Sequence, residues 1–162
     1  MNKTQTVNAT VDLQIPLKNY SDFLPAEKEI ARWVNAACAE LKYDVELTIR
    51  ISDAEEITDL NATYRGKSYA TNVLSFPAEI PEEIDLALLG DIVICADVVN
   101  KEAKEQAKTR ESHWAHMVIH GTLHLLGYDH MTDAEAEEME NKEIILMQQL
   151  GFINPYLTTE NK

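Results

Sequence analysis

The chain has few cysteines, and it lacks both a long apolar run and a signal-like beginning. Its two cysteines, Cys38 and Cys95, lie far apart and form no C-x-x-C pair. We therefore expect small core side chains in a reducing compartment rather than a disulfide. No run reaches the roughly 18 apolar residues that span a bilayer, and the opening residues MNKTQTVNATVDLQ lack the apolar stretch of a signal peptide. These absences predict a soluble cytoplasmic protein without a membrane partner.

Positive charge is scarce as well. The sequence has 14 Lys and Arg against 28 Asp and Glu, which gives a formal net charge of −14 at pH 7. This balance favours solubility and argues against a non-specific nucleic-acid binder, which is usually basic. The charge is unevenly spread, since residues 133–143 are acidic whereas Lys101, Lys104, Lys108 and Arg110 form a milder basic cluster. A local basic cleft on an acidic body is compatible with this composition.

Size and patterning predict the fold class. The 162 residues are 45% hydrophobic and 26% charged, as in folded globular chains. No repeat or linker divides them, so we expect a single catalytic domain over residues 1–162. Strict alternation at Val45, Leu47, Ile49 and Ile51 predicts a half-buried strand. Further strands are expected at 7–15, 73–76 and 88–95, and helices at 25–41, 53–64, 97–107, 111–126 and from about 132 to 150.

Two helix starts carry capping signals. Ser52-Asp53-Ala54-Glu55 fits a capping box with the serine as the cap, and Thr132 can cap the last helix. Because strands dominate the front of the chain and helices its end, we predict an α+β fold. The expected architecture is a small mixed sheet of about four strands packed with about five helices.

The segment HWAHMVIHGTLHLL (113–126) is apolar on almost every side, which predicts a buried helix. His116, His120 and His124 share one of its faces at a spacing of four residues. They cannot all bind one ion, because the first and last lie about 12 Å apart along the helix axis. A zinc–nitrogen bond is only about 2.0–2.1 Å long. Two adjacent histidines can therefore clamp a metal, and a third ligand must come from elsewhere.

Gly127 ends this helix three residues after His124, so the chain can fold back and bring His130 to the same point. The ligands predicted in this way are His120, His124 and His130. Three neutral imidazoles without a fourth protein ligand are typical of a catalytic zinc site with an open position. We expect one Zn²⁺ per chain, although nickel or another first-row ion suits three imidazoles as well.

The neighbouring polar residues have less specific readings. His113 and His116 are expected to be core histidines, and His116 has the alternative of orienting a ligand from behind the site. Asp129, beside the third predicted ligand, reads equally well as an acceptor for a ligand or as a turn residue.

The spacing H-x3-H-x2-G-x2-H is also that of the metzincin proteases, so the predicted fold carries a metzincin-like zinc motif. Those enzymes have a glutamate directly after the first histidine, which acts as the general base. Here that position is Gly121, and nothing else in the motif supplies a base. A metzincin-like peptidase or another metal-dependent hydrolase remains an alternative function.

Four blocks of the sequence follow one another in a characteristic order. They are LNATYRGKSYATNVLSFP (60–77), LLGDIVIC (88–95), HWAHMVIHG (113–121) and HGTLHLLGYDH (120–130). Together they resemble the YbeY family, bacterial endoribonucleases that mature ribosomal RNA. The resemblance spans about residues 45 to 155 and implies one α+β domain with a zinc ion on His120, His124 and His130. It also implies an arginine acting in the cleft, which is Arg65 here. Ser68 departs from the family pattern, in which many members have an acidic residue.

By this resemblance we expect a zinc-dependent, single-strand-specific endoribonuclease that matures the 3′ end of 16S rRNA and acts in ribosome quality control. Single-stranded ribosomal RNA is the expected partner, and ribosomal proteins or assembly GTPases suit an acidic surface. A non-enzymatic ribosome-assembly factor with a structural zinc is a further alternative. No oligomeric state follows from the sequence.

The chemistry of the residues agrees with this reading. Zinc polarises a phosphoryl oxygen or generates hydroxide near neutral pH. A guanidinium binds phosphate oxygens through two parallel hydrogen bonds. Arg65 follows a predicted helix, in a loop that could sit over the metal, with Lys67 adding positive potential. Asn72 and Ser75 are candidates for lining the same cleft.

Overall fold

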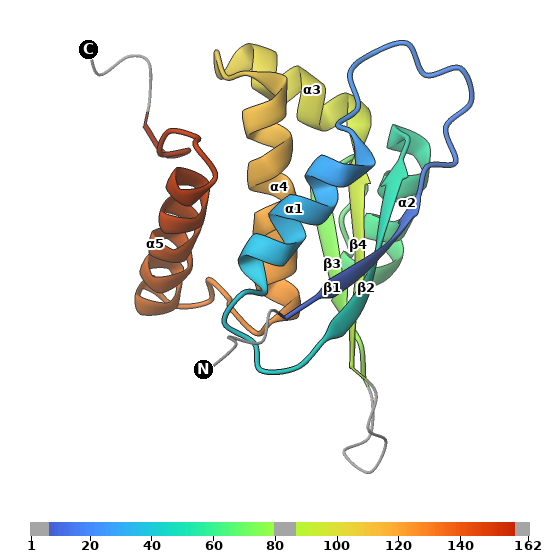
Figure 1. Cartoon of the computed structure of the whole chain (residues 1–162). Helices are drawn as coiled ribbons and strands as arrows, with labels where there is room; N and C mark the ends of the chain where they lie inside the picture. The colour runs from blue at the N-terminus through green and yellow to red at the C-terminus, as the bar shows by residue number, and fades with distance from the viewer. Residues whose placement is uncertain (1–6, 80–86, 158–162) are drawn as a thin grey trace, which may run out of the picture.

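The structure of the chain, a computed structural model, describes residues 7–79 and 87–157. Its strands are β1 (Ala9–Gln14), β2 (Val45–Ser52), β3 (Val73–Pro77) and β4 (Leu88–Cys95). Its helices are α1 (Glu27–Ala37), α2 (Ala54–Arg65), α3 (Ala96–Glu105), α4 (Arg110–Leu125) and α5 (Asp133–Gln149). Within the described ranges, five helices and a four-stranded mixed sheet form the α+β fold that the sequence predicts (Figure 1).

The strands lie in the order β1-β2-β4-β3. The first three are parallel, with Val11 beside Leu47 and Ile49 beside Ile92, and β3 runs antiparallel to β4 with Val73 beside Ile94. The strand β3 is therefore an edge of the sheet. This edge matters for function, because it forms one wall of the cleft described below.

Helices cover both faces of the sheet. On one face lie α1 and α4, on the other lies α2, and α5 packs on the side of α4 that faces away from the sheet (Figure 1). The alternating residues of β2 point into the core under α1 and α4. The end of β4 is buried on both sides, since Ile92 and Ile94 join that core while Val93 and Cys95 pack with Ile57 under α2.

The predicted burial of the histidine helix is confirmed. Most of α4 is buried, including Trp114, Val118, Ile119 and Leu123, because the helix lies between the sheet and α5. Its histidines consequently project inside the molecule or at the floor of a cleft. Both cysteines are buried and free, as expected for small core side chains.

The helix caps agree with the sequence at α5 and differ from it at α2. Thr132 and Glu135 form the capping box of α5, as predicted. The prediction for α2 is wrong by one residue, because its N-cap is Asp53, whose side chain accepts from the backbone N–H of Glu56 at 2.8 Å. Ser52 is the last residue of β2 and is fully buried, so its hydroxyl is not free to cap a helix.

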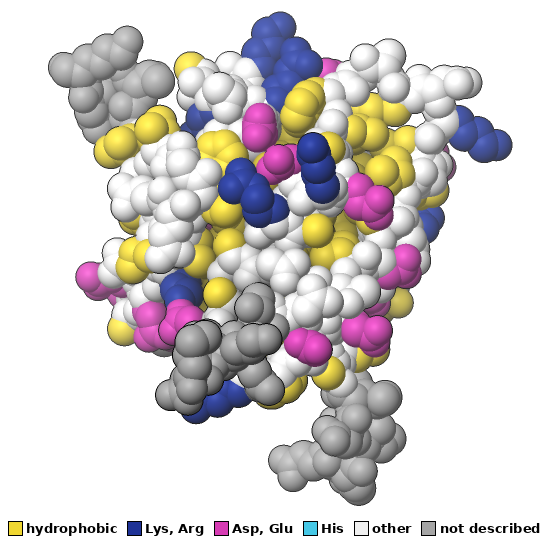
Figure 2. Space-filling view, viewed as in Figure 1, with side chains coloured by type: hydrophobic (Ala, Val, Ile, Leu, Met, Phe, Trp, Pro, Cys, Tyr) yellow, Lys and Arg dark blue, Asp and Glu magenta, His cyan; other side chains and the backbone are white. Residues whose placement is uncertain are grey.

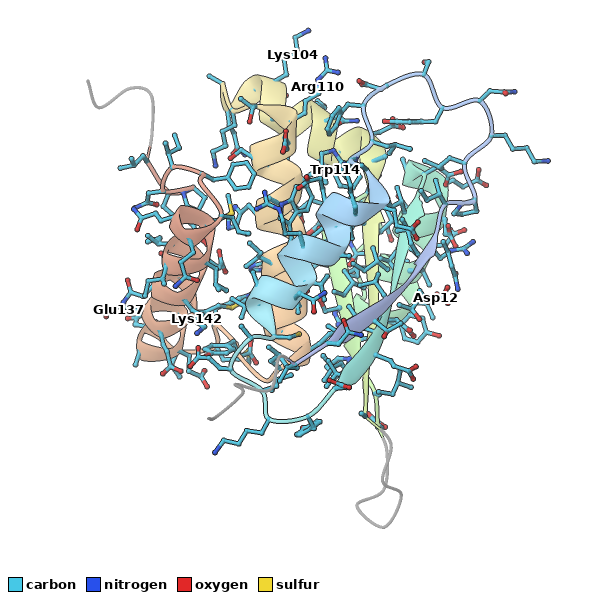
Figure 3. All side chains as sticks on the ribbon, in the orientation of Figure 1. Asp12, Lys104, Arg110, Trp114, Glu137 and Lys142 are labelled. Carbon is cyan, nitrogen blue, oxygen red and sulfur yellow. The ribbon has the colours of Figure 1, made fainter. Side chains whose placement is uncertain are left out.

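The basic cluster lies apart from the histidines. Lys104 and Arg110 project at the end of the molecule where α3 meets α4 (Figure 3), and the space-filling view shows basic side chains gathered there (Figure 2). Arg110 forms an ion pair with Asp22 at 3.0 Å. None of the described helices has the length and apolar character needed to cross a membrane.

Candidate metal centre

Three histidines converge where α4 ends. His120 and His124 lie one turn apart on α4, with ring centroids 4.6 Å apart, and the ring of His130 lies 5.0 Å from that of His124. One ligand nitrogen from each ring lies within 4.8 Å of the others. This spacing is close enough for one ion to bridge all three, so the cluster could hold a metal. The histidines that the sequence singles out are thus brought together.

A tight turn carries His130 back to the helix. Gly127 adopts φ +103°, a left-handed conformation that side chains disfavour, and the N–H of Tyr128 donates to the carbonyl of Leu123 at 3.0 Å. Asp129 accepts from the backbone N–H of His130 at 2.8 Å through Oδ1, a bond typical of a turn residue.

Hydrogen bonds fix the orientation of two of the rings. Nδ1 of His120 lies 2.9 Å from Oε2 of Glu143, and Nδ1 of His124 lies 3.0 Å from the carbonyl oxygen of Tyr128. The Tyr128 carbonyl oxygen can only accept a hydrogen bond, and so can the Glu143 carboxylate when it is ionised. Each Nδ1 therefore carries the hydrogen and donates it. Each Nε2 then keeps a lone pair, which is the form a metal ligand requires. The donor set therefore fits a metal ion.

The electrostatics also favour a neutral ring at His124. Burial, together with the neighbouring His120 and His130, lowers the pKa of His124. Burial alone would raise the pKa of Glu143, but hydrogen bonds from His116 and His120 outweigh it and lower that pKa to about 2. The carboxyl group is consequently an anion at neutral pH.

Glu143 is a residue that the sequence reasoning missed. It lies in the acidic stretch 133–143, which reads as a solvated surface. Glu137 of the same stretch does lie on the outer side of α5 (Figure 3), whereas Glu143 is 1% exposed. The available signal was its register, since it shares the core face of α5 with Met139, Leu146 and Met147.

The two histidines predicted to be core residues are buried and lie outside the cluster. His116 bonds to Glu143 through Nε2 at 2.5 Å, and burial lowers its pKa. His113 bonds through Nε2 to Glu102 at 2.9 Å, and Glu102 also accepts from the side-chain amide of Asn72. Each histidine thus bonds to a carboxylate: His116 to Glu143, which also contacts the cluster, and His113 to Glu102.

A cleft of about 820 Å³ opens over the three histidines. Its walls come from the end of α2, the loop that follows, the edge strand β3 and the turn after α4. The polar side chains predicted at this place all line it: Arg65, Lys67, Asn72 and Ser75. The cations that face the histidines therefore come from the end of α2, and the basic cluster around Lys104 is not among the lining residues.

Arg65 is held at the wall by the edge strand. Its Nη2 donates to the carbonyl oxygen of Ser75 at 2.9 Å, and its Cζ lies 5.3 Å from the centroid of the Phe76 ring. Gly66 ends α2 in a left-handed conformation, with φ +70°, which turns the chain directly after the arginine. The guanidinium is exposed to solvent, and most of its N–H groups are free to bind a ligand.

The position after the first histidine has no room for a side chain. A Cβ atom on Gly121 would lie 2.9 Å from Cγ2 of Ile92 and 3.3 Å from Oγ of Ser75. The carbonyl oxygen of Gly121 accepts from the Ser75 hydroxyl at 3.1 Å, which ties α4 to β3 at this point. The general base of a metzincin protease would therefore collide with the sheet here.

Aromatic and apolar side chains complete the rim of the cleft. Tyr69 is 55% exposed, and its carbonyl oxygen accepts from the buried side-chain amide of Asn61 at 2.9 Å, which anchors the loop. Tyr128 and the highly exposed Met131 line the cleft from the turn after α4. The cleft thus offers cations, imidazoles and flat apolar surfaces together.

One comparison with known proteins identifies a family. The family model described as endoribonuclease YbeY matches residues 17–151, which include every residue that lines the cleft. Among solved structures, the chain is similar to the solution structure of TM1509 from Thermotoga maritima. The sequence identity is 23%, the TM-score is 0.49, and the alignment covers 88% of this chain and 91% of that chain.

Proposed function

We propose that this chain, which belongs to the endoribonuclease YbeY family, cleaves single-stranded RNA with a zinc ion held by its histidine cluster. An endoribonuclease role in rRNA processing follows from that membership. Maturation of the 3′ end of 16S rRNA and a role in ribosome quality control are the finer parts of the proposal. We also propose that residues 1–162 act as one catalytic domain.

One observation carries the metal assignment. The ligand nitrogens of His120, His124 and His130 lie within 4.8 Å of one another, and hydrogen bonds leave Nε2 free on the first two. When bound, zinc supplies Lewis-acid polarisation of a phosphoryl oxygen and lowers the pKa of water. The three histidines, which line the cleft, would hold the ion where a phosphodiester can approach it.

Arg65 is the proposed catalytic residue of the chain itself. Cleavage of a phosphodiester builds negative charge on the phosphate oxygens, and a guanidinium binds those oxygens through paired hydrogen bonds. Because the Ser75 carbonyl holds Nη2, the guanidinium is already oriented before RNA binds. Lys67 lines the same cleft and adds positive potential.

The rim supports a preference for single strands. Unpaired bases stack on aromatic side chains, whereas the bases of a duplex are not available for stacking. Tyr69 and Tyr128 offer such surfaces beside the cations. For further partners, the net charge of −14 suits basic ribosomal proteins or RNA-bound assembly GTPases.

The test compares three variants for metal content and RNA cleavage. His120→Ala should lose bound metal and cleavage together, whereas Arg65→Glu should keep the metal and lose cleavage. Arg65→Lys should restore little, since an ammonium keeps the charge but not the paired geometry. The matched control is Arg32→Glu, because Arg32 is a half-exposed arginine paired with Glu29 and does not line the cleft.

Two outcomes would overturn the assignment. If Arg65→Glu cleaves a single-stranded oligonucleotide as fast as the parent, the phosphate role of the arginine is wrong. If purified wild-type protein holds no metal and still cleaves RNA, the metal assignment is wrong.

A further inference from the structure

A buried carboxylate lies among apolar side chains directly behind the histidine cluster. Glu143 is 1% exposed and sits on the core face of α5. Removing an ionised carboxylate from water costs several kcal/mol even after the protein relaxes. An apolar side chain would fill this position without that cost, so packing alone does not explain the glutamate. Its hydrogen-bond partners do.

All the partners of Glu143 are donors. Oε1 accepts from Nε2 of His116 at 2.5 Å and from the hydroxyl of Tyr156, and Oε2 accepts from Nδ1 of His120 at 2.9 Å. The two bonds to Oε1 fix the rotation of the carboxylate. As a result, Oε2 is turned toward His120 and holds the ring with Nε2 on the side of the cleft.

The other histidine of α4 in the cluster is oriented differently. Nδ1 of His124 donates to the backbone carbonyl of Tyr128, which the turn after α4 provides whatever side chain stands there. Within residues 7–79 and 87–157, Nδ1 of His120 has only the Glu143 side chain as its acceptor. A single substitution, at Glu143, can therefore remove the hydrogen bond that orients the His120 ring.

We propose that Glu143 is the positioning residue of the metal centre, and that His116 and Tyr156 hold its carboxylate in the orientation that aims His120 at the ion. This inference rests on the proposed function, because it treats the histidine cluster as a metal site. It adds a residue from α5 and one from the segment after α5 to that site.

Tyr156 reaches the site from a segment that lies beyond the family match at 17–151. Its ring packs edge-on against His116, with centroids 5.3 Å apart. Next to it, the carbonyl oxygen of Pro155 accepts from Nζ of Lys108 at 2.6 Å, which fastens this segment to the loop between α3 and α4. The residues after α5 therefore support the metal centre from behind.

The first experiment measures zinc affinity by competition with a chromophoric chelator. Glu143→Gln should raise the dissociation constant of zinc by about 10- to 100-fold, the usual effect of losing such an orienting partner. The matched control is Glu102→Gln, since Glu102 also holds a histidine of α4 at 2.9 Å but does not contact the cluster. Its zinc affinity should stay within about twofold of the wild type.

A second measurement reads the orientation without any metal. In the metal-free protein, a long-range ¹H–¹⁵N spectrum should show the hydrogen of His120 on Nδ1. In Glu143→Gln the ring should shift toward the form with the hydrogen on Nε2, while His124 stays unchanged. If Glu143 contributed only to stability, its substitution would not move the ring hydrogen of His120 while leaving that of His124 in place.

If Glu143→Gln does not fold, another variant tests the same positioning role. Tyr156→Phe removes only the hydroxyl and should raise the zinc dissociation constant by about 2- to 10-fold, the range of one hydrogen bond. Its control is Tyr20→Phe, which loses a tyrosine–carboxylate bond to Asp97, a residue that does not bond to the cluster or to Glu143. Both controls should match the wild type.

The outcomes separate this inference from the proposed function. If wild-type protein binds zinc and both Glu143→Gln and Tyr156→Phe bind it equally well, the positioning role is overturned while the metal site stands. If wild-type protein binds no zinc, the metal site itself fails. If His120 carries its hydrogen on Nε2 in the metal-free wild type, the positioning role is overturned whatever the zinc affinity.

Discussion

At the scale of single residues, Gly121 shows how packing limits the chemistry of the site. A methyl group at this position would lie 2.9 Å from Cγ2 of Ile92, a fully buried and stiff β-branched side chain. Overpacking of this kind costs about 1–3 kcal/mol, and the better helix propensity of alanine returns at most about 1 kcal/mol. The glycine is therefore required by the contact between α4 and β4.

We expect Gly121→Ala to be less stable than the wild type by about 1 kcal/mol in urea unfolding, because the overlap outweighs the gain in propensity. In an Ile92→Ala background, where the obstructing methyl is absent, the same substitution should cost nothing or stabilise. An equal cost in both backgrounds would show that the contact with Ile92 is not the cause.

Tyr69 is the residue at which substrate binding can be separated from metal binding. We expect Tyr69→Ala to weaken binding of a single-stranded oligonucleotide by about 1–3 kcal/mol, the usual contribution of one stacked base. Zinc affinity should not change, since Tyr69 is not one of the three candidate ligands. Fluorescence anisotropy on chelator-treated protein, which cannot cut the probe, measures the binding.

The control for this prediction is Tyr43→Ala, because Tyr43 is 60% exposed and does not line the cleft. Equal losses in the two variants, or no loss in Tyr69→Ala, would contradict a stacking role.

At the scale of the elements, the start of α2 allows a direct test of its cap. Asp53→Ala should lower the free energy of unfolding by about 1 kcal/mol, because the N–H of Glu56 loses its side-chain acceptor. Ser52→Ala should have a smaller effect, since the Ser52 hydroxyl makes only a long contact of 3.5 Å with the carbonyl of Ile94. Calorimetry of the two variants compares them, and the opposite order would restore serine as the cap.

Most elements were predictable because their signals are local. Alternation located β2, and four-residue spacing located α4. The cap of α2 was misplaced because β2 extends as far as Ser52, which pairs with Cys95. Serine and aspartate are both good N-cap residues, so the sequence alone does not show which of the two ends the strand and which caps the helix. The strand order β1-β2-β4-β3 depends on pairing between distant segments, which no local pattern reports.

The same distinction applies to the site. His120, His124 and His130 were predictable because a helix turn and a glycine place them within one short segment. Arg65 was named through the family resemblance, and the structure brings it to the same cleft. Glu143 and Tyr156 were missed because they meet the histidines only through the packing of α5 against α4.

At the scale of the whole molecule, the net charge of −14 disfavours RNA binding over most of the surface, so we expect the phosphate contacts to be confined to the cations of the cleft. If two cations contact phosphates, the logarithm of the affinity for a single strand should fall with the logarithm of salt concentration with a slope of about −1.4. Lys67→Ala should reduce this slope by about 0.7. A slope steeper than about −4 would point to a second basic surface, such as the one around Lys104.

All three candidate ligands lie within eleven consecutive residues, 120–130. A denatured chain keeps these imidazoles close together, so it retains part of its capacity to capture zinc. A ligand raises the melting temperature only to the extent that it binds the native state more tightly than the denatured state. Added zinc should consequently raise the melting temperature less than the native dissociation constant alone implies.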